Sequence, residues 1–256
     1  NSCHRSLRRT LQLHIFTEQI VINTRCRIYC NDKSKICNLK SKILPVPIFF
    51  QQQINENTRL GVWKIEETEE FFKGNVPQHR DVTHPHKRLQ HLAGRFLLQY
   101  LFSDFPYELI QIADTRKPFL PDAQYHFSIS HCGDYAAAIV SKESRVGIDV
   151  EIPVEKIEKI IYKFLSAKEL DRFNLVPGAG KGTGVDNFNE VTTLWSAKEA
   201  VFKWYGNGGV DFRKQIQLFS RNEEKETIDC FFSKNESELI IHYSQFDGLV
   251  LAWVVS

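Results

Sequence analysis

Three acidic residues and one lysine stand at spacings that would bring their side chains together. Asp149 and Glu151 alternate along the apolar segment Val146–Glu151, so in a β-strand both carboxylates leave the same face. Glu199 and Lys203 are four residues apart in an apolar-periodic segment, so in a helix they share one face. Mg²⁺ prefers oxygen ligands, and an ammonium group binds phosphate. The four side chains would hold a cation and a phosphate, although Glu199 and Lys203 alone are typical of a solvated helix pair.

The predicted helix that carries Glu199 covers residues 191–206. Its apolar residues recur at spacings of three and four, namely Leu194, Trp195, Ala197, Val201 and Phe202. Gly206 ends this pattern, as glycine does at a helix C-cap. The helix and the strand 146–151 are therefore the two elements that must meet for the acids to converge.

Ser130 and His131 follow an apolar segment and are the next candidates for chemistry. A hydrolase nucleophile and base are not favoured, because adjacent residues in a strand point in opposite directions and no Gly-x-Ser-x-Gly motif is present. A hydroxyl and an imidazole at a strand end suit phosphate binding better. The alternative is a histidine that only stabilises a turn at residues 131–134.

A second predicted helix, residues 84–101, carries a cationic cluster. Its apolar stripe consists of Leu89, Leu92, Ala93, Phe96, Leu97 and Tyr100, and the cations Lys87, Arg88, His91 and Arg95 lie around the other faces. These cations are either solvated or form an anion site.

The remaining pattern predicts a mixed α+β protein. Strands are expected at residues 48–54, 60–65, 108–114, 125–129, 135–141, 215–220, 226–233, 238–244 and 249–255, the last four in an antiparallel sheet. Short helices are expected at 66–72 and 155–164, and Ser166 with Glu169 forms a capping box at the start of another. Two helix-and-strand units of comparable size meet near residues 143–146. The predicted organisation is a basic leader at 1–47, an N-terminal lobe at 48–145 and a C-terminal lobe at 146–256.

The charge of the chain is unevenly distributed. Residues 1–47 hold nine lysines and arginines against two acids, and subtracting these from the totals of 33 and 31 leaves 24 basic and 29 acidic residues. A mildly acidic body does not favour nucleic-acid binding. No apolar run reaches the roughly 20 residues of a membrane helix. The leader resembles an organelle-targeting segment, and a misassigned start would also explain it.

Two further patterns are weak. The six cysteines are expected as unpaired thiols of a cytoplasmic protein, because Cys26, Cys30 and Cys37 match zinc-ligand spacing only loosely. Residues 177–183 resemble part of a P-loop, but Leu175 and Gly182 stand where the motif needs glycine and Ser or Thr. A surface loop is the better interpretation of this segment.

Four motifs in order identify a resemblance to the 4′-phosphopantetheinyl transferase superfamily. They are Phe127-Ser-Ile-Ser-His-Cys-Gly133, Gly147-Ile-Asp-Val-Glu151, Phe164-Leu-Ser-Ala-Lys-Glu169 and Trp195-Ser-Ala-Lys-Glu-Ala-Val-Phe-Lys203. Arg116-Lys-Pro118 resembles the Gly-Lys-Pro element of that family, with Arg116 in place of glycine. The length of the body resembles the single-chain, two-lobed type that activates surfactin synthetase. This resemblance implies a pseudo-twofold pair of lobes, each a small antiparallel sheet on a long helix, with the site between them.

The resemblance also implies the activity: the phosphopantetheine arm of coenzyme A moves to a serine of an apo acyl, peptidyl or polyketide carrier protein, and adenosine 3′,5′-bisphosphate is released. By motif position, Asp149, Glu151 and Glu199 would bind Mg²⁺, while Lys203 and Lys198 would contact phosphate. His131 with Ser130 would contact a coenzyme A phosphate, and Lys117, Lys87 and Arg88 would bind the nucleotide end. The serine's proton would go to Glu151, Glu169 or a metal-bound water, of which Glu169 is preferred because a metal ligand is a poor base.

Two other functions remain open on the sequence. Acids and a lysine around Mg²⁺ also serve metal-dependent nucleases and phosphohydrolases. A non-catalytic module that only binds carrier proteins is the other alternative, and the presence of all three acids argues against it. A monomer is expected, because two lobes in one chain would complete the site, and no membrane association is expected.

Overall fold

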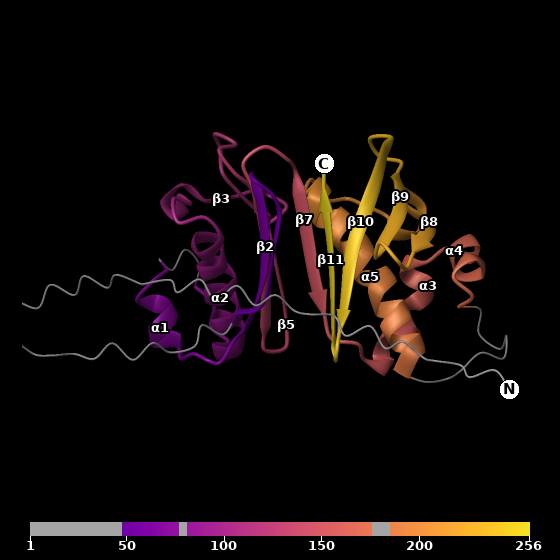
Figure 1. The fold of residues 1–256 in the computed structure, drawn as a ribbon, viewed down its shortest axis with the longest axis horizontal. Helices are drawn as coiled ribbons and strands as arrows, with labels where there is room; N and C mark the ends of the chain where they lie inside the picture. Colours follow the sequence, from indigo (N-terminus) through magenta and orange to yellow (C-terminus); the bar gives the residue numbers. More distant parts are fainter. Residues whose placement is uncertain (1–47, 77–80, 176–184) are drawn as a thin grey trace, which may run out of the picture. The chain divides into compact units, whose positions relative to one another are not determined.

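The computed structural model describes residues 48–76, 81–175 and 185–256. All of them belong to one compact unit, Pro45–Ser256. Two antiparallel sheets and two long helices, α2 (Pro85–Leu101) and α5 (Val185–Tyr205), make up most of this unit (Figure 1). The predicted α+β class with antiparallel sheets is therefore confirmed, and the pseudo-twofold relation stays a prediction.

The first sheet has the strand order β1-β2-β6-β5 and packs on α2. Its strands are β1 (Ile48–Asn55), β2 (Thr58–Lys64), β5 (His126–Cys132) and β6 (Tyr135–Ser141). Helix α2 begins where expected, since the side chain of His84 caps it and Pro85 occupies the first turn, where a missing N–H costs nothing. Its apolar stripe is buried against one face of β6, so α2 and β5 are held side by side.

The second sheet has the order β7-β11-β10-β9-β8 and packs on α5. Its strands are β7 (Val146–Glu151), β8 (Ile216–Asn222), β9 (Thr227–Phe232), β10 (Ser237–Phe246) and β11 (Leu249–Val255). A Cβ on Gly147 would collide with the backbone of Ala200 and Trp204, so only glycine lets β7 approach α5 this closely. This contact brings Asp149, two residues later, against the helix.

A third apolar cluster joins the two sheets. It combines Leu60, Val62, Ala137 and Ile139 of the first sheet with Ile148, Val150, Leu251 and Trp253 of the second. Alternation along β6 makes this possible, because Ala136, Ala138 and Val140 belong to the core under α2 while the residues between them face β7 and β11. The two halves of the unit thus share a core, and β5 lies beside β7.

Shorter elements complete the unit. They are α1 (Glu69–Lys73), η1 (Tyr107–Leu109), β3 (Gln111–Ile112), β4 (Pro118–Phe119), η2 (Glu155–Ile160), α3 (Ile161–Phe164), α4 (Ala167–Arg172) and α6 (Phe212–Gln215). The predicted capping box of Ser166 and Glu169 is confirmed at the start of α4. No helix in the described part of the chain is both long and apolar enough to cross a membrane.

Three expectations about elements were wrong. Residues 108–114 do not form one strand, because Tyr107 turns inward and its hydroxyl donates to the backbone oxygen of Arg95, which leaves only a 3₁₀ turn and two strand residues. His131 lies within β5, and the turn that follows this strand consists of Gly133 and Asp134. Helix α5 begins at Val185, six residues before the expected start at residue 191. The P-loop-like segment 177–183 lies outside the described residues.

Candidate active site

Asp149 is the centre of a polar cluster formed by three elements. Its carboxylate is almost fully buried on β7, and both oxygens accept hydrogen bonds. Oδ1 accepts from Ser130 Oγ of β5 at 2.8 Å and from Lys203 Nζ of α5 at 2.6 Å. Oδ2 accepts from Ser196 Oγ of α5 at 2.9 Å. The contact between the first acid and the helix lysine, expected from their spacing, is present.

Glu151 and Glu199 carry further negative charge beside Asp149. Burial raises the pKa of Glu199 to about 7, and repulsion from Asp149 and Glu151 adds to the shift. Burial and Asp149 also raise the pKa of Glu151, whose Oε1 accepts a hydrogen bond of 3.2 Å from Trp195 Nε1. The acids are thus near enough to repel one another, while the charge of Lys203 lowers the pKa of both Glu151 and Glu199.

The donor chemistry of this group fits a hard divalent cation. Carboxylate oxygens are the ligands that Mg²⁺ takes in proteins, and mutual repulsion between acids is what a bound cation would relieve. No three His, Cys, Asp or Glu side chains in the described part of the chain are arranged as a ready ligand set. Hydrogen bonds already fill positions around Asp149, so the predicted magnesium site stays a prediction.

Ser130 and His131 leave β5 in opposite directions. Ser130 is buried and donates to Asp149, so its hydroxyl belongs to the acid cluster. His131 is exposed, and the pKa of its ring is lowered by partial desolvation and then by the charges of Lys203 and Lys87. The ring therefore stands in a region of positive potential between β5, α2 and α5, and it does not act on Ser130.

Lys117 lies at the C-terminal end of α5. Its Nζ donates to the backbone oxygen of Lys203 at 2.6 Å, where the helix carbonyls favour a cation. Arg116 beside it has a φ of 66°, a conformation that favours glycine. Glycine is also the residue at this position in the Gly-Lys-Pro element that Arg116-Lys-Pro118 resembles. Thr115 Oγ1 donates to the backbone oxygen of Gly206 at 3.0 Å. The segment before β4 is thus fixed to the end of α5.

A pocket of about 360 Å³ opens at Lys117. Its wall contains three nitrogen bases, Lys117, His126 and Arg145, together with aromatic rings of Phe119, Tyr125 and Tyr205, and no carboxylate among the described residues that line it. Burial and then Arg145 lower the pKa of Lys117 to about 8. Burial, Arg145 and Lys117 lower the pKa of His126. The pocket is suited to an anion with an aromatic group.

The cationic face of α2 divides into two kinds of residue. The guanidinium of Arg88 donates to Glu69 Oε1 and to the backbone oxygens of Val82 and Thr83, so it fixes the chain that enters α2. Lys87, by contrast, is near enough to lower the pKa of His131. Arg95 is buried, and its Nη1 has no hydrogen-bond partner among the described residues. Lys87 therefore lies near His131, whereas the guanidinium of Arg88 is engaged by the segment that precedes α2.

Lys198 and Glu169 are not brought into the Asp149 cluster. They pair with each other at 2.6 Å, and their side chains are 0% and 3% exposed. A phosphate contact needs a free N–H on Lys198, and a general base needs a free oxygen on Glu169. Neighbouring groups fill both, so we revise the roles expected for these two residues.

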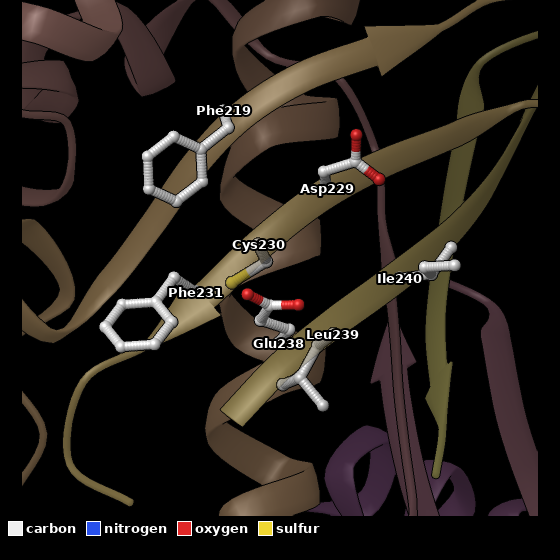
Figure 2. A pocket seen from close by; sticks show the side chains of 7 residues that line it. All are labelled: Phe219, Asp229, Cys230, Phe231, Glu238, Leu239 and Ile240. Carbon is white, nitrogen blue, oxygen red and sulfur yellow. The ribbon is translucent and has the colours of Figure 1, made fainter. Parts of the chain in front are cut away.

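A hollow of about 620 Å³ lies elsewhere, on the face of β8, β9 and β10 that α5 does not cover (Figure 2). Phe219, Phe231 and Ile240 stand there with Asp229 and Glu238, and Asp229 accepts a hydrogen bond from Ser220. The hollow has apolar and acidic walls, without a lysine or arginine among its lining residues. It does not suit a phosphate-bearing ligand.

Ser196 was missed by sequence reasoning although it holds Asp149. Ser196 is buried inside the helix. Serine is disfavoured there unless its hydroxyl has a hydrogen-bond partner, so a serine within an apolar helical pattern was the available signal. Arg145 and His126 were missed as well, because they become neighbours of Lys117 only through the packing of β5, β7 and β4. The motif residues around them gave no spacing from which to predict the pocket.

An α+β fold that gathers acids and a lysine beside a cationic pocket is typical of proteins that handle phosphate groups. Residues 145–254 match the model of the 4′-phosphopantetheinyl transferase superfamily. The matched segment contains Asp149, Glu151, Glu199 and Lys203. The expected recognition is confirmed, whereas the two-lobed subtype stays a prediction.

Curated proteins agree with this family. Enterobactin synthase component D of Escherichia coli (strain K12) is 32% identical over 121 residues, which cover 46% of this chain and 54% of that protein. The 4′-phosphopantetheinyl transferase AcpT of Escherichia coli O157:H7 is 38% identical over 126 residues, covering 47% and 59%. Enterobactin synthase component D of Salmonella austin is 37% identical over 150 residues, covering 57% and 61%. The chain thus spans between about half and three fifths of the length of these relatives.

Proposed function

We propose that this protein transfers the 4′-phosphopantetheine arm of coenzyme A to a serine of an apo carrier protein and releases adenosine 3′,5′-bisphosphate. The observation that carries the proposal is the convergence of Asp149, Ser130 and Lys203 from three elements, inside or beside the segment that matches the transferase superfamily. The reaction joins a serine oxygen to the β-phosphorus of coenzyme A and breaks the bond to the bridging oxygen of the pyrophosphate. Such transfers depend on positioning and on charge neutralisation.

Asp149, Glu151 and Glu199 would hold Mg²⁺. When bound, the cation would neutralise the pyrophosphate and favour departure of the nucleotide phosphate. The raised pKa values of Glu151 and Glu199 support this assignment, because burial is joined in both by repulsion from Asp149, which a bound cation would relieve. Transfer would therefore depend on Mg²⁺.

Lys203 would stabilise the phosphate that receives the serine oxygen. In the structure its ammonium lies at 2.6 Å from Asp149 Oδ1 and 2.7 Å from Ser130 Oγ, so it is held at the edge of the acid group. A side chain that is 26% exposed can turn from Asp149 toward a ligand. The positive charge then lies where negative charge accumulates during transfer.

The serine's proton would pass to a water beside the acid group. Asp149, Glu151 and Glu199 are assigned to the metal, and a metal ligand is a poor base. Glu169, the base preferred on sequence grounds, has both carboxylate oxygens occupied by hydrogen bonds.

The nucleotide end of coenzyme A would bind along the cationic side of the site. The pocket at Lys117 combines cations with aromatic rings, which suits an adenine and its phosphates. Lys87 and His131 would contact a phosphate nearer α2, since Lys87 is close enough to lower the pKa of His131. We also propose a monomer acting in the cytoplasm on an acyl, peptidyl or polyketide carrier, without nucleic acid or membrane.

Intact-mass analysis of an apo carrier tests the proposal. The carrier is incubated with this protein, coenzyme A and Mg²⁺, with an EDTA control. We expect the carrier to gain the mass of one phosphopantetheine group, and we expect EDTA to prevent the gain. A carrier that is bound without gaining mass would favour a non-catalytic binding module. Hydrolysed coenzyme A with an unmodified carrier would favour a phosphohydrolase.

A further inference from the structure

Glu169 and Lys198 form a buried ion pair in the core beneath α5. Among the described residues of that core, they are the charged side chains that take no part in the proposed transfer chemistry. Glu169 lies in the first turn of α4, and Lys198 lies in the middle of α5. Burying two charges costs more free energy than their attraction usually returns, and an apolar pair of similar volume is often as stable. The pair therefore calls for an explanation other than stability.

Every hydrogen-bonding position of Lys198 is used. Its Nζ donates to Glu169 Oε1 at 2.6 Å, to the backbone oxygen of Phe212 at 2.9 Å and to that of Ile216 at 2.7 Å. An ammonium has three N–H donors, so none is left. The three partners belong to α4, α6 and β8, and they surround the lysine from different directions.

Glu169 is equally occupied. Its Oε1 also accepts from the backbone N–H of Leu218 at 3.0 Å, and its Oε2 accepts from the N–H and the hydroxyl of Ser166 at 2.7 and 2.8 Å. The carboxylate is thus fixed to β8 and to the start of α4. Through it, Lys198 is fixed in distance and in direction.

Lys198 directly precedes Glu199 on α5. Successive helix residues are turned by about 100°, so an anchor on Lys198 sets the direction in which Ser196, Glu199 and Lys203 point. These residues must meet Asp149, and Ser196 and Lys203 do so at 2.9 and 2.6 Å. Apolar contacts alone would allow α5 to rotate or slide slightly, because packing without directional bonds has several near-equivalent arrangements.

We propose that Glu169 and Lys198 are positioning residues that set the rotation and axial register of α5. The inference rests on the proposed transfer reaction, since the geometry it protects is that of Ser196, Glu199 and Lys203 at Asp149. A displacement of about 1 Å at a reacting centre can lower a rate about a hundredfold. The pair thus acts on the site from the opposite side of the helix.

The test compares Glu169→Gln, Lys198→Met and the double variant with the wild-type protein. Each single change leaves one buried charge uncompensated, whereas the double change removes both charges and recovers that part of the lost stability, while the carbonyls of Phe212 and Ile216 still lose their donor. We expect kcat for transfer to fall about a hundredfold in all three variants. The double variant separates the two roles, because its folding recovers while its rate does not.

Ile241→Ala is the matched control. Ile241 is fully buried on β10 in the same core and takes no part in the ion pair. We expect its loss to lower stability while kcat per folded molecule stays within about twofold, because a distant core cavity leaves the anchor intact. A double variant whose rate recovers together with its stability would overturn the proposal.

Amide hydrogen exchange supplies a second measurement that needs no substrate. We expect faster exchange in α5, α4 and the start of β8 in the pair variants, with α2 and β5 unchanged. Uniformly faster exchange throughout the described unit would show a general loss of stability and would contradict the positioning role. A wild-type protein that transfers nothing would instead overturn the proposed function, and exchange would still decide the role of the pair.

Discussion

Helix α5 carries two lysines that each pair with a buried carboxylate at 2.6 Å, and the two pairs differ in what surrounds them. Lys198 and Glu169 are enclosed, and backbone groups occupy their remaining positions. Lys203 and Asp149 lie beside two further acids, and the lysine side chain is 26% exposed. The same chemical pair is therefore saturated on one side of the helix and unsaturated on the other.

This difference shows how an ion pair is assigned to structure or to chemistry. A saturated pair has no free donor or acceptor, so a ligand can reach it only by breaking bonds that the fold needs. An unsaturated pair with surplus negative charge gains from a cation, and its lysine gains from an anion. The distance between the charged atoms, 2.6 Å in both pairs, does not separate the cases. The number of remaining partners does.

The largest expected effect comes from breaking the open pair at its acid. Asp149→Asn keeps the shape and the contacts of Ser130 and Ser196 but removes the charge that Lys203 and a metal would share. We expect transfer to fall about a thousandfold, in line with the loss of a central electrostatic group. Rates from the carrier mass assay, with denaturant midpoints to confirm folding, measure this. Near-wild-type rates in Asp149→Asn would refute the proposed metal assignment.

Removing the lysine of the open pair should lower transfer less than Asp149→Asn does, and it should strengthen metal binding. In Lys203→Met the ammonium no longer occupies Asp149 Oδ1, so a divalent cation meets no competitor there. We expect transfer to fall about a hundredfold, because a charged contact to phosphate is lost. We expect affinity for Mg²⁺ or Mn²⁺, measured by titration calorimetry, to rise. Weaker metal binding would mean that Lys203 supports the cation and does not compete with it.

Much of this contrast could be predicted from the sequence, but one part could not. Strand alternation placed Asp149 beside Glu151, helix spacing placed Glu199 beside Lys203, and the capping box of Ser166 and Glu169 was recognised. The side of α5 that faces the site was harder to predict. Apolar residues occupy nearly all faces of the helix, and both Lys198 and Lys203 resemble site residues. Only the packing of α6 and β8 shows that Lys198 is enclosed.

The same limit explains the errors around the nucleotide pocket. The apolar residues Leu109, Ile110 and Ile112 resemble part of a strand, yet the buried ring of Tyr107 diverts the chain. Lys117 was predicted as a contact from its motif, whereas Arg145 and His126 come to its side from distant strands. Tertiary proximity of this kind leaves no periodic signal in a single sequence.

A moderate effect is expected in the pocket at Lys117. Lys117→Met should raise the KM for coenzyme A about tenfold by removing one cation from the pocket, with little change in kcat. The pKa of Lys117 is about 8, so its charge is present below pH 8 and is lost as the pH rises through that value. Affinity of the wild-type protein for coenzyme A should therefore fall between about pH 7 and 9.

The Lys117→Met variant is the control for the predicted pH dependence of coenzyme A affinity. If Lys117 is the group that titrates, the variant keeps a nearly constant KM over this range. A variant whose KM still rises through pH 8 would assign the titration to another group, because Lys117 is no longer there to lose a proton.

The smallest expected effect comes from Ser196, which holds the second oxygen of Asp149 at 2.9 Å. Ser196→Ala should lower transfer about fivefold, the cost of one hydrogen bond of about 1 kcal/mol to the carboxylate. Ser128→Ala is the matched control, since this buried hydroxyl accepts from the backbone N–H of Ile148 at 3.2 Å and does not touch Asp149. Both variants lose one buried hydrogen bond and should lose similar stability in urea unfolding. Only Ser196→Ala should lose rate, because the open pair needs its carboxylate oriented as well as charged; equal rates in the two variants would show that Lys203 and Ser130 orient Asp149 without Ser196.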